Sequence, residues 1–174
     1  MALTVETGAI IADAESYVSV TDANAYHTAR NNAGWTGADS LKEAALRRAT
    51  SYIDWKYSRK WKGLRVAPAQ PLMWPRNFVL QFEEEGFLGY ANSPVYINSN
   101  VIPQCLKDAV CEAALRALTE NMEDDTVTGI KSKTIGGVIE TVFTGSSEDS
   151  RKSYPIVERL LSSLLKSNNN LVRG

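Results

Sequence analysis

The sequence has little of the side-chain chemistry on which most enzymes depend. Among 174 residues it has one histidine, His27, whereas hydrolytic triads and most zinc sites need imidazole. It has no G-x-x-x-x-G-K-[ST] loop to hold phosphates, and no G-x-G-x-x-G follows a predicted strand. Two runs of acids, at 83–85 and 124–125, lie in polar segments and are expected to be solvated. We therefore expect no enzymatic activity, no metal and no cofactor, and we expect His27 to be an exposed or capping residue on a helix surface.

Cysteine, net charge and long apolar runs are also scarce. Cys105 and Cys111 lie six residues apart in a predicted helix, where about 100° per residue puts them on different faces. They are expected to be separate thiols in a reducing compartment. The net charge is −1, so no global field draws the protein onto nucleic acid or an anionic membrane. The apolar stretch at 9–12 is too short for a signal peptide or a membrane span, which predicts a cytoplasmic protein without a membrane partner.

The apolar residues recur mostly at helical spacing. This spacing predicts a short helix with Thr21 as its N-cap and Gly34 closing it, a second from Ser40 to about Lys60, a third from Pro103 to Leu118 and a fourth that opens at Pro155. The second begins with Ser40-x-x-Glu43, which has the form of a capping box. The third has the longest stripe, formed by Leu106, Ala109, Val110, Ala113, Ala114, Ala117 and Leu118. Because alanine lets a neighbouring helix approach closely, we expect this helix at the centre of the core.

Two segments depart from the helical pattern. Residues 62–101 contain four prolines, three glycines and aromatic residues without a steady period, which predicts a long irregular central loop. Around 130–144, β-branched residues flank Gly136-Gly137, a pattern typical of a two-residue β-hairpin turn. An isolated ribbon is marginal in water, so it must pack on helices or be completed by a neighbouring subunit. The expected fold is mainly α, a small helical bundle with a β-hairpin, in a single domain over 1–167 followed by a tail at 168–174.

A basic and aromatic stretch lies in the middle of this nearly neutral chain. Between positions 40 and 76 nine lysines and arginines accompany two acids, Glu43 and Asp54. Cationic grooves with aromatic platforms hold single strands without reading their sequence, which makes Trp55, Trp61, Arg59 and Lys62 candidates for contact with nucleic acid.

Tryptophan and arginine are also enriched at protein interfaces, so this stretch has a second interpretation. We predict that Trp61, Trp74 and Arg76, together with Ile135 and Val138 of the hairpin, contact another subunit or a partner. In that interpretation Arg59, Lys60 and Lys62 are the residues that face DNA.

Five segments resemble one family of phage proteins. They are SYVSVTDANAY (16–26), KEAALRRATSYID (42–54), the W-x-G…Q-P-L-x-W-P-R motif (61–76), IPQCLKDAVCEAALRAL (102–118) and the closing LVRG (171–174). The resemblance covers nearly the whole chain, in order. The family is labelled as DnaT-like single-stranded DNA-binding proteins, and it looks similar to the head-tail connector, or head-completion, adaptors of tailed bacteriophages.

The resemblance to adaptors implies a ring, expected to be dodecameric, that sits on the portal protein, binds a tail, tail-terminator or stopper protein on its other face, and lets DNA pass through. Its expected place is the neck of the virion, after assembly in the cytoplasm of the host bacterium. Leu171, Val172, Arg173 and Gly174 would then be the portal contacts, although a frayed terminus has a similar composition. The DnaT-like label implies instead a single-stranded DNA-binding accessory of replication.

Overall fold

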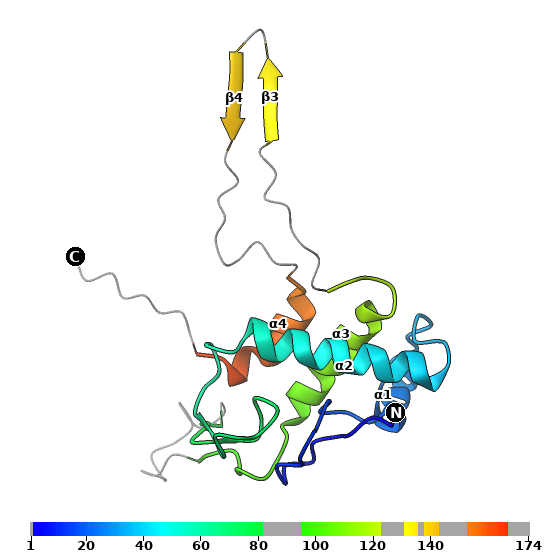
Figure 1. Cartoon of the computed structure of the whole chain (residues 1–174), viewed down its shortest axis with the longest axis vertical. Coiled ribbons are helices and arrows are strands. Elements are labelled where there is room, and N and C mark those ends of the chain that lie inside the picture. Colours follow the sequence, from blue (N-terminus) through cyan, green and yellow to red (C-terminus); the bar gives the residue numbers. More distant parts are fainter. Residues whose placement is uncertain (1, 82–94, 123–130, 136–137, 143–152, 167–174) are drawn as a thin grey trace, which may run out of the picture.

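The computed structural model describes residues 2–81, 95–122, 131–135, 138–142 and 153–166 (Figure 1). Its helices are α1 (Val20–Ala29), α2 (Asp39–Lys56), α3 (Gln104–Ala117) and α4 (Pro155–Leu161), which continues into the short 3-10 helix η2 (Ser162–Leu164). Its strands are β1 (Leu64–Arg65), β2 (Arg76–Asn77), β3 (Lys131–Ile135) and β4 (Val138–Val142). The prediction of a mainly α fold with a β-hairpin is confirmed.

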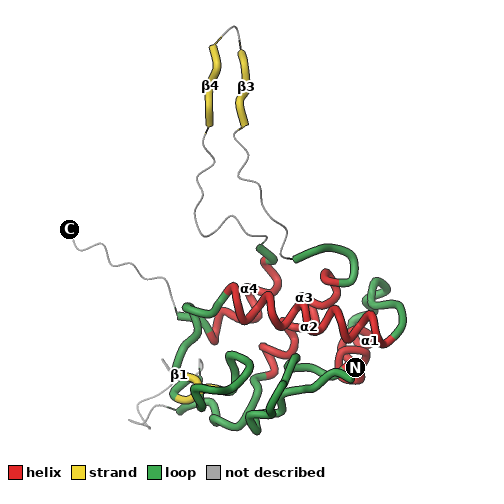
Figure 2. The backbone as a smooth tube through the Cα atoms, viewed as in Figure 1, coloured by secondary structure: helices red, strands yellow, loops and turns green. Residues whose placement is uncertain are grey.

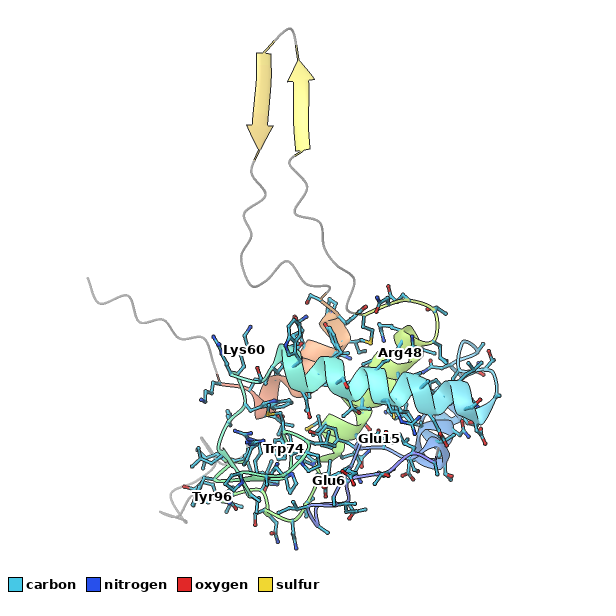
Figure 3. All side chains as sticks on the ribbon, in the orientation of Figure 1. Glu6, Glu15, Arg48, Lys60, Trp74 and Tyr96 are labelled. Atoms are coloured by element: carbon cyan, nitrogen blue, oxygen red, sulfur yellow. The ribbon has the colours of Figure 1, made fainter. Side chains whose placement is uncertain are left out.

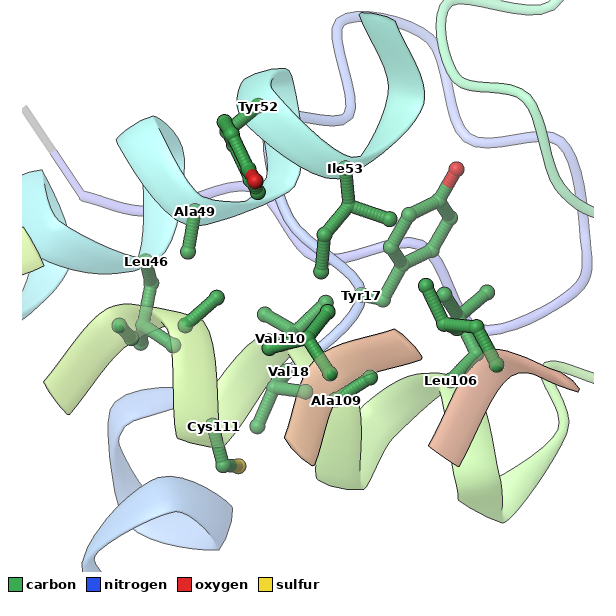
Figure 4. Packing of buried hydrophobic residues seen from close by; sticks show 14 of the residues in the cluster. Tyr17, Val18, Leu46, Ala49, Tyr52, Ile53, Leu106, Ala109, Val110 and Cys111 are labelled. Carbon is green, nitrogen blue, oxygen red and sulfur yellow. The ribbon is translucent and has the colours of Figure 1, made fainter. Parts of the chain in front are cut away.

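The core forms where α2 packs against α3, and α4 also packs against α3. Leu46, Ala49 and Ile53 project from α2 and meet Ala109 and Val110 of α3, all with no exposed surface (Figure 4). The small alanine side chains let the two helix backbones approach closely. The predicted apolar stripe of the third helix is therefore core from Leu106 to Ala117, and Leu118 packs at its edge.

The helix interface leaves no room for a larger side chain at Ala113, which has no exposed surface. Ala113→Leu is expected to lower the free energy of unfolding by about 1 to 3 kcal/mol, because added methylenes in a packed core force neighbouring side chains off their rotamers. Urea unfolding followed by circular dichroism measures this. An unchanged unfolding midpoint would mean that α3 does not pack here as described.

Three local predictions were wrong. The cap of α1 is Ser19, whose hydroxyl accepts a hydrogen bond from the Asp22 amide at 3.1 Å, and not Thr21. At α2 the N-cap is Ala38, which has no side-chain cap bond, so Ser40 forms no capping box. The same helix ends at Lys56 and not near Lys60, since the chain there turns to pair with the segment that follows α4.

His27 is buried, which corrects the prediction of an exposed histidine. It keeps 1% of its surface, and its ring stacks on Trp35 with the ring centres 4.5 Å apart. Ala23 lies one turn earlier on the same face of α1 and is also buried. Burial disfavours the imidazolium and holds the pKa of His27 below its ordinary value.

Both cysteines are free thiols, as predicted: Cys111 is buried in the core, and Cys105 is partly buried at the start of α3. Burial raises the pKa of both thiols, that of Cys111 to about 12, so neither is a ready nucleophile.

The segment before α1 is organised around a buried acid, Glu6 (labelled in Figure 3). Its carboxylate accepts hydrogen bonds from the amides of Gly8, Ile10 and Ile11, at 2.7, 3.0 and 2.8 Å. Gly8 has a φ of 109°, and a Cβ there would lie 1.9 Å from the carbonyl oxygen of Asn100. Only glycine therefore fits where this loop meets the segment before α3.

The central segment is irregular but ordered where it is described. β1, labelled in Figure 2, pairs antiparallel with β2, and Leu80 and Tyr96 form a bridge further along. Residues 82–94 lie outside the described part of the chain.

The predicted hairpin is present. β3 and β4 pair antiparallel from Lys131 opposite Val142 to Ile135 opposite Val138, so two residues, Gly136 and Gly137, lie between the strands. These two residues and the segments that join the hairpin to α3 and α4 lie outside the described residues.

Candidate nucleic-acid and partner interface

The chain after α2 and the chain after α4 form a short two-stranded edge. The Lys62 amide donates to the Leu164 carbonyl at 2.9 Å, and the Lys166 amide donates to the Lys60 carbonyl at 2.8 Å. Trp61 and Leu165 face each other at the centre of this pairing. Trp61 points inward and keeps only 1% of its surface, so its neighbours on the extended chain, Lys60 and Lys62, point outward.

A cationic edge results, which we define as Arg59, Lys60, Lys62 and Lys166. All are exposed except Lys62, which is partly exposed (Lys60 is labelled in Figure 3). The sequence has no acid between 55 and 81. The carboxylate of Glu158, in α4, forms an ion pair with the Lys56 ammonium at 3.4 Å. The three residues predicted to face DNA therefore lie together at the surface, joined by Lys166, which sequence reasoning missed.

The two tryptophans predicted to contact a partner lie in the core instead. Trp61 and Trp74 keep 1% and 0% of their surface, and their rings meet edge to face at 6.0 Å. Tyr57 packs on the other side of Trp61. Sequence alone cannot distinguish a tryptophan that fills its own core from one that fills a neighbour's, because both positions favour a large apolar ring.

Arg76 is also internal and holds the loop together. Its guanidinium donates to three carbonyl groups, from Nε to Lys62 at 2.7 Å, from Nη2 to Gly63 at 2.8 Å and from Nη1 to Met73 at 3.2 Å. Only 7% of Arg76 is exposed, and burial holds its pKa below the ordinary value. Its donors serve its own chain, so it is not free to bind a partner's carboxylate or a phosphate.

The rest of the W-x-G…Q-P-L-x-W-P-R motif has the same structural role. The Gln70 side chain accepts from the Ala67 amide at 3.0 Å and donates to the carbonyls of Leu72 and Pro75 at 2.9 and 3.1 Å. Gly63 has a φ of 65°, and a Cβ there would lie 2.1 Å from the Asn77 carbonyl oxygen. The motif therefore specifies one loop conformation, which presents the cationic edge on one side and an apolar surface on the other.

That apolar surface is formed by Leu64, Phe78 and Tyr96, of which 65%, 67% and 45% are exposed. The rings of Phe78 and Tyr96 meet edge to face at 6.2 Å. Phe78 has a φ of 60°, an uncommon and strained backbone conformation for a bulky residue. None of these three was singled out from the sequence, where isolated apolar residues in a loop carry no signal of exposure.

A partly buried carboxylate ties this loop to the helices. Asp54 of α2 accepts the Tyr17 hydroxyl at 2.8 Å and the Met73 amide at 2.9 Å, and the Tyr17 oxygen in turn accepts the Trp74 amide at 3.0 Å. Burial raises the pKa of Asp54 to about 6, and it outweighs the opposing effect of these hydrogen bonds and of the Arg76 charge.

Asp54 gives a prediction on pH. Its pKa in the folded state, about 6, exceeds its ordinary value of 3.8, so the folded protein binds this proton more tightly than the unfolded chain. The stability it contributes is fully present below pH 3.8 and is lost as the pH rises through 6. The stability of the wild type relative to Asp54→Asn should therefore fall by up to about 3 kcal/mol between pH 4 and 7.5.

Urea unfolding of both proteins at several pH values measures this difference, and the titration of His27 cancels because both proteins contain it. A difference that does not change with pH would show that Asp54 has an ordinary pKa.

The other residues predicted to contact a partner have no described side chains. Ile135 and Val138 pair with each other where β3 and β4 meet the turn, but only their backbone is described. Leu171, Val172, Arg173 and Gly174 lie outside the described residues.

The described residues include no group of three or more histidine, cysteine, aspartate or glutamate side chains that could hold a metal ion. Within the same residues, no helix is both long and apolar enough to cross a bilayer. A cavity of about 410 Å³ lies between the Leu80–Tyr96 bridge, the start of α3 and η2, and it is lined mainly by apolar side chains and by Cys105.

The fold and this surface define a small helical protein with an inserted hairpin and an exposed cationic edge. A family model described as "Putative DnaT-like ssDNA binding protein" matches residues 1–174, and the chain belongs to that family. No curated protein and no solved structure matches the chain.

Proposed function

We propose that the protein is a structural subunit of a tailed bacteriophage, a head-tail connector that forms a ring under the portal and links the capsid vertex to the tail. It acts by presenting surfaces to copies of itself and to its partners, so it has no need of a catalytic group or a cofactor. The resemblance of the motifs to adaptor proteins supports this role, and so does the long connection between α3 and α4.

The observation that carries the proposal is the insertion between α3 and α4. These two helices pack against each other, and the Tyr154 hydroxyl at the start of α4 donates to Glu120, just after α3, at 3.1 Å. A connection of 2 to 8 residues suffices between such neighbours. The chain instead runs through residues 123–152, which contain the β3–β4 hairpin. Where burial is described, the core residues come from 17–122 and 157–164, and a connection this much longer than the two packed helices need favours a role for it in contacts beyond the subunit.

In the proposed ring, which we expect to be dodecameric, DNA passes through the centre and the cationic edge lies within reach of its phosphates. The protein would be assembled in the cytoplasm of the host and would remain in the neck of the virion. The portal protein would bind residues 171–174, and a tail, tail-terminator or stopper protein would bind the opposite face of the ring.

A truncation tests the portal contact. Deleting residues 168–174 should leave the fold intact, because the core residues that the structure describes all precede Lys166, and should abolish binding to the portal protein. A pull-down with portal protein measures binding, and the circular dichroism spectrum checks the fold. Retention of the truncated protein on portal would show that the tail is not the anchor.

A second candidate function is single-stranded DNA binding, as the family's description states. The cationic edge and Trp55, which is 50% exposed, support it. The geometry supports it only in part. Of the five aromatic residues of the basic stretch, Tyr52, Tyr57, Trp61 and Trp74 are buried and Trp55 is exposed, whereas a platform for successive bases needs several exposed rings.

Binding of a labelled oligonucleotide at increasing salt tests this candidate. If the cationic edge binds phosphates, Lys60→Glu with Lys62→Glu should weaken binding and reduce the salt dependence by about one counterion per lost contact. Arg48→Glu, an exposed change on the middle of α2, is the matched control and should have little effect. Failure of the wild type to bind at low salt would exclude this function.

A further inference from the structure

The charges of the chain are segregated along it although they nearly cancel in sum. Residues 1–43 carry six acids and two bases, whereas residues 44–81 carry eight bases and one acid. α1 and the start of α2 lie at one end of the helical body, and β1 lies at the other end (Figures 1 and 2). Helix α2, with 18 residues, spans the distance of about 27 Å between them.

The basic end carries the apolar surface already described. Leu64, Phe78 and Tyr96 are exposed there, and Leu64 adjoins the exposed Arg65 and follows Lys62 by two residues. Phe78 keeps its strained backbone conformation while two thirds of it are in contact with solvent. A strained residue that adds little to the core of its own subunit is typical of a functional contact.

The acidic end carries a counterpart. Leu41, in the first turn of α2, is 58% exposed and stands beside the exposed Asp39. Asp22, in the first turn of α1, is also exposed. The Lys42 ammonium donates to the side chain of Asn24, in the middle of α1, at 3.0 Å and so ties α1 to the first turn of α2. The exposed Leu41 beside Asp39 thus complements an apolar surface next to Lys62 and Arg65.

We propose that these two surfaces bind each other between copies of the chain, with Leu64 and Phe78 of one copy against Leu41 and Asp39 of the next. A second copy of the chain therefore covers the apolar surface, because the charges beside the two surfaces are of opposite sign. Because the two surfaces differ and lie at opposite ends, the contact is head to tail, and repeating it builds a ring or an open filament. This inference rests on the proposed function, in which copies assemble, and it names the surfaces that meet.

Two variants, each with one surface blocked, test the contact. The first, Leu64→Ser with Phe78→Ser, keeps the acidic surface, and the second, Leu41→Ser with Asp39→Lys, keeps the basic surface. Sedimentation velocity over a range of concentrations should show wild-type assemblies larger than a dimer and should show each variant alone as a monomer. An equal mixture of the two variants should form a 1:1 heterodimer and nothing larger, since one intact surface of each kind remains. Val101→Ser, which removes a side chain that is 45% exposed elsewhere, should assemble like the wild type.

The outcomes separate this inference from the proposed function. Assembly of either variant alone, or a mixture that stays monomeric, would overturn the head-to-tail contact while leaving a ring built through other surfaces. A wild type that remains monomeric at every concentration would overturn the contact and count against the proposed function as well. Circular dichroism confirms that each variant is folded before its mass is interpreted.

Discussion

Arg76→Met should lower the free energy of unfolding by about 3 to 5 kcal/mol, among the largest effects of any single change in the described chain. Methionine fills much of the same volume but donates no hydrogen bond, so the carbonyls of Lys62, Gly63 and Met73 lose the donors that hold them. Because these carbonyls belong to both sides of the loop, the cationic edge should lose its fixed conformation as well.

Urea unfolding measures the effect, and Arg65→Met is its matched control. Arg65 also donates to two carbonyls, of Pro68 at 2.8 Å and Gln70 at 3.4 Å, but it is exposed, so water replaces the lost bonds. This change should cost less than about 1 kcal/mol. Equal effects at the two positions would contradict the internal role assigned to Arg76.

Replacing residues 123–152 with a short glycine–serine linker should leave the folding of the helical body unchanged and weaken its assembly. The contact between Glu120 and Tyr154 already brings the ends of α3 and α4 together, so the helical body should keep its unfolding free energy within about 1 kcal/mol. Without the hairpin, binding to portal or to further copies should fall at least tenfold, a loss of about 1.4 kcal/mol or more in binding free energy.

Thermal unfolding and a portal pull-down measure the two effects on the same preparation. Loss of the fold in the linker variant would mean that the insertion belongs to the core, and unchanged binding would remove the main structural argument for the proposed function.

Local patterns in the sequence were enough to predict the helices and the hairpin. The stripe from Leu106 to Ala117 and the β-branched residues around Gly136-Gly137 depend on spacing within one element, which the chain displays directly. Helix ends were predicted less well. Ser40 and Glu43 have the spacing of a capping box, but the N-cap of α2 is Ala38, two positions earlier.

The sequence predicts which residues of the candidate site are exposed only where the side chain is charged. Arg59, Lys60 and Lys62 lie at the surface as expected, since a charged side chain is costly to bury. Trp61, Trp74 and Arg76 were expected at an interface and are internal, because burial in one's own core depends on segments far apart in the chain. The alternation Lys60-Trp61-Lys62 is the one local sign that Trp61 points inward.

Other parts of the site arise from distant contacts that leave no local pattern. Lys166 joins the cationic edge through pairing with Lys60, and Asp54 meets Tyr17 and Met73. His27 was expected at the surface because histidine is often found there, but its i, i+4 partner Ala23 shows that it shares the buried face of α1.

The mass of the complex formed when the purified protein is mixed with its portal protein tests the central claim most directly. Native mass spectrometry should find many copies of the chain on each portal ring, in a fixed number that matches a closed ring of subunits. A chain that never joins portal and instead binds single-stranded oligonucleotides as a monomer would contradict the account and favour the replication accessory.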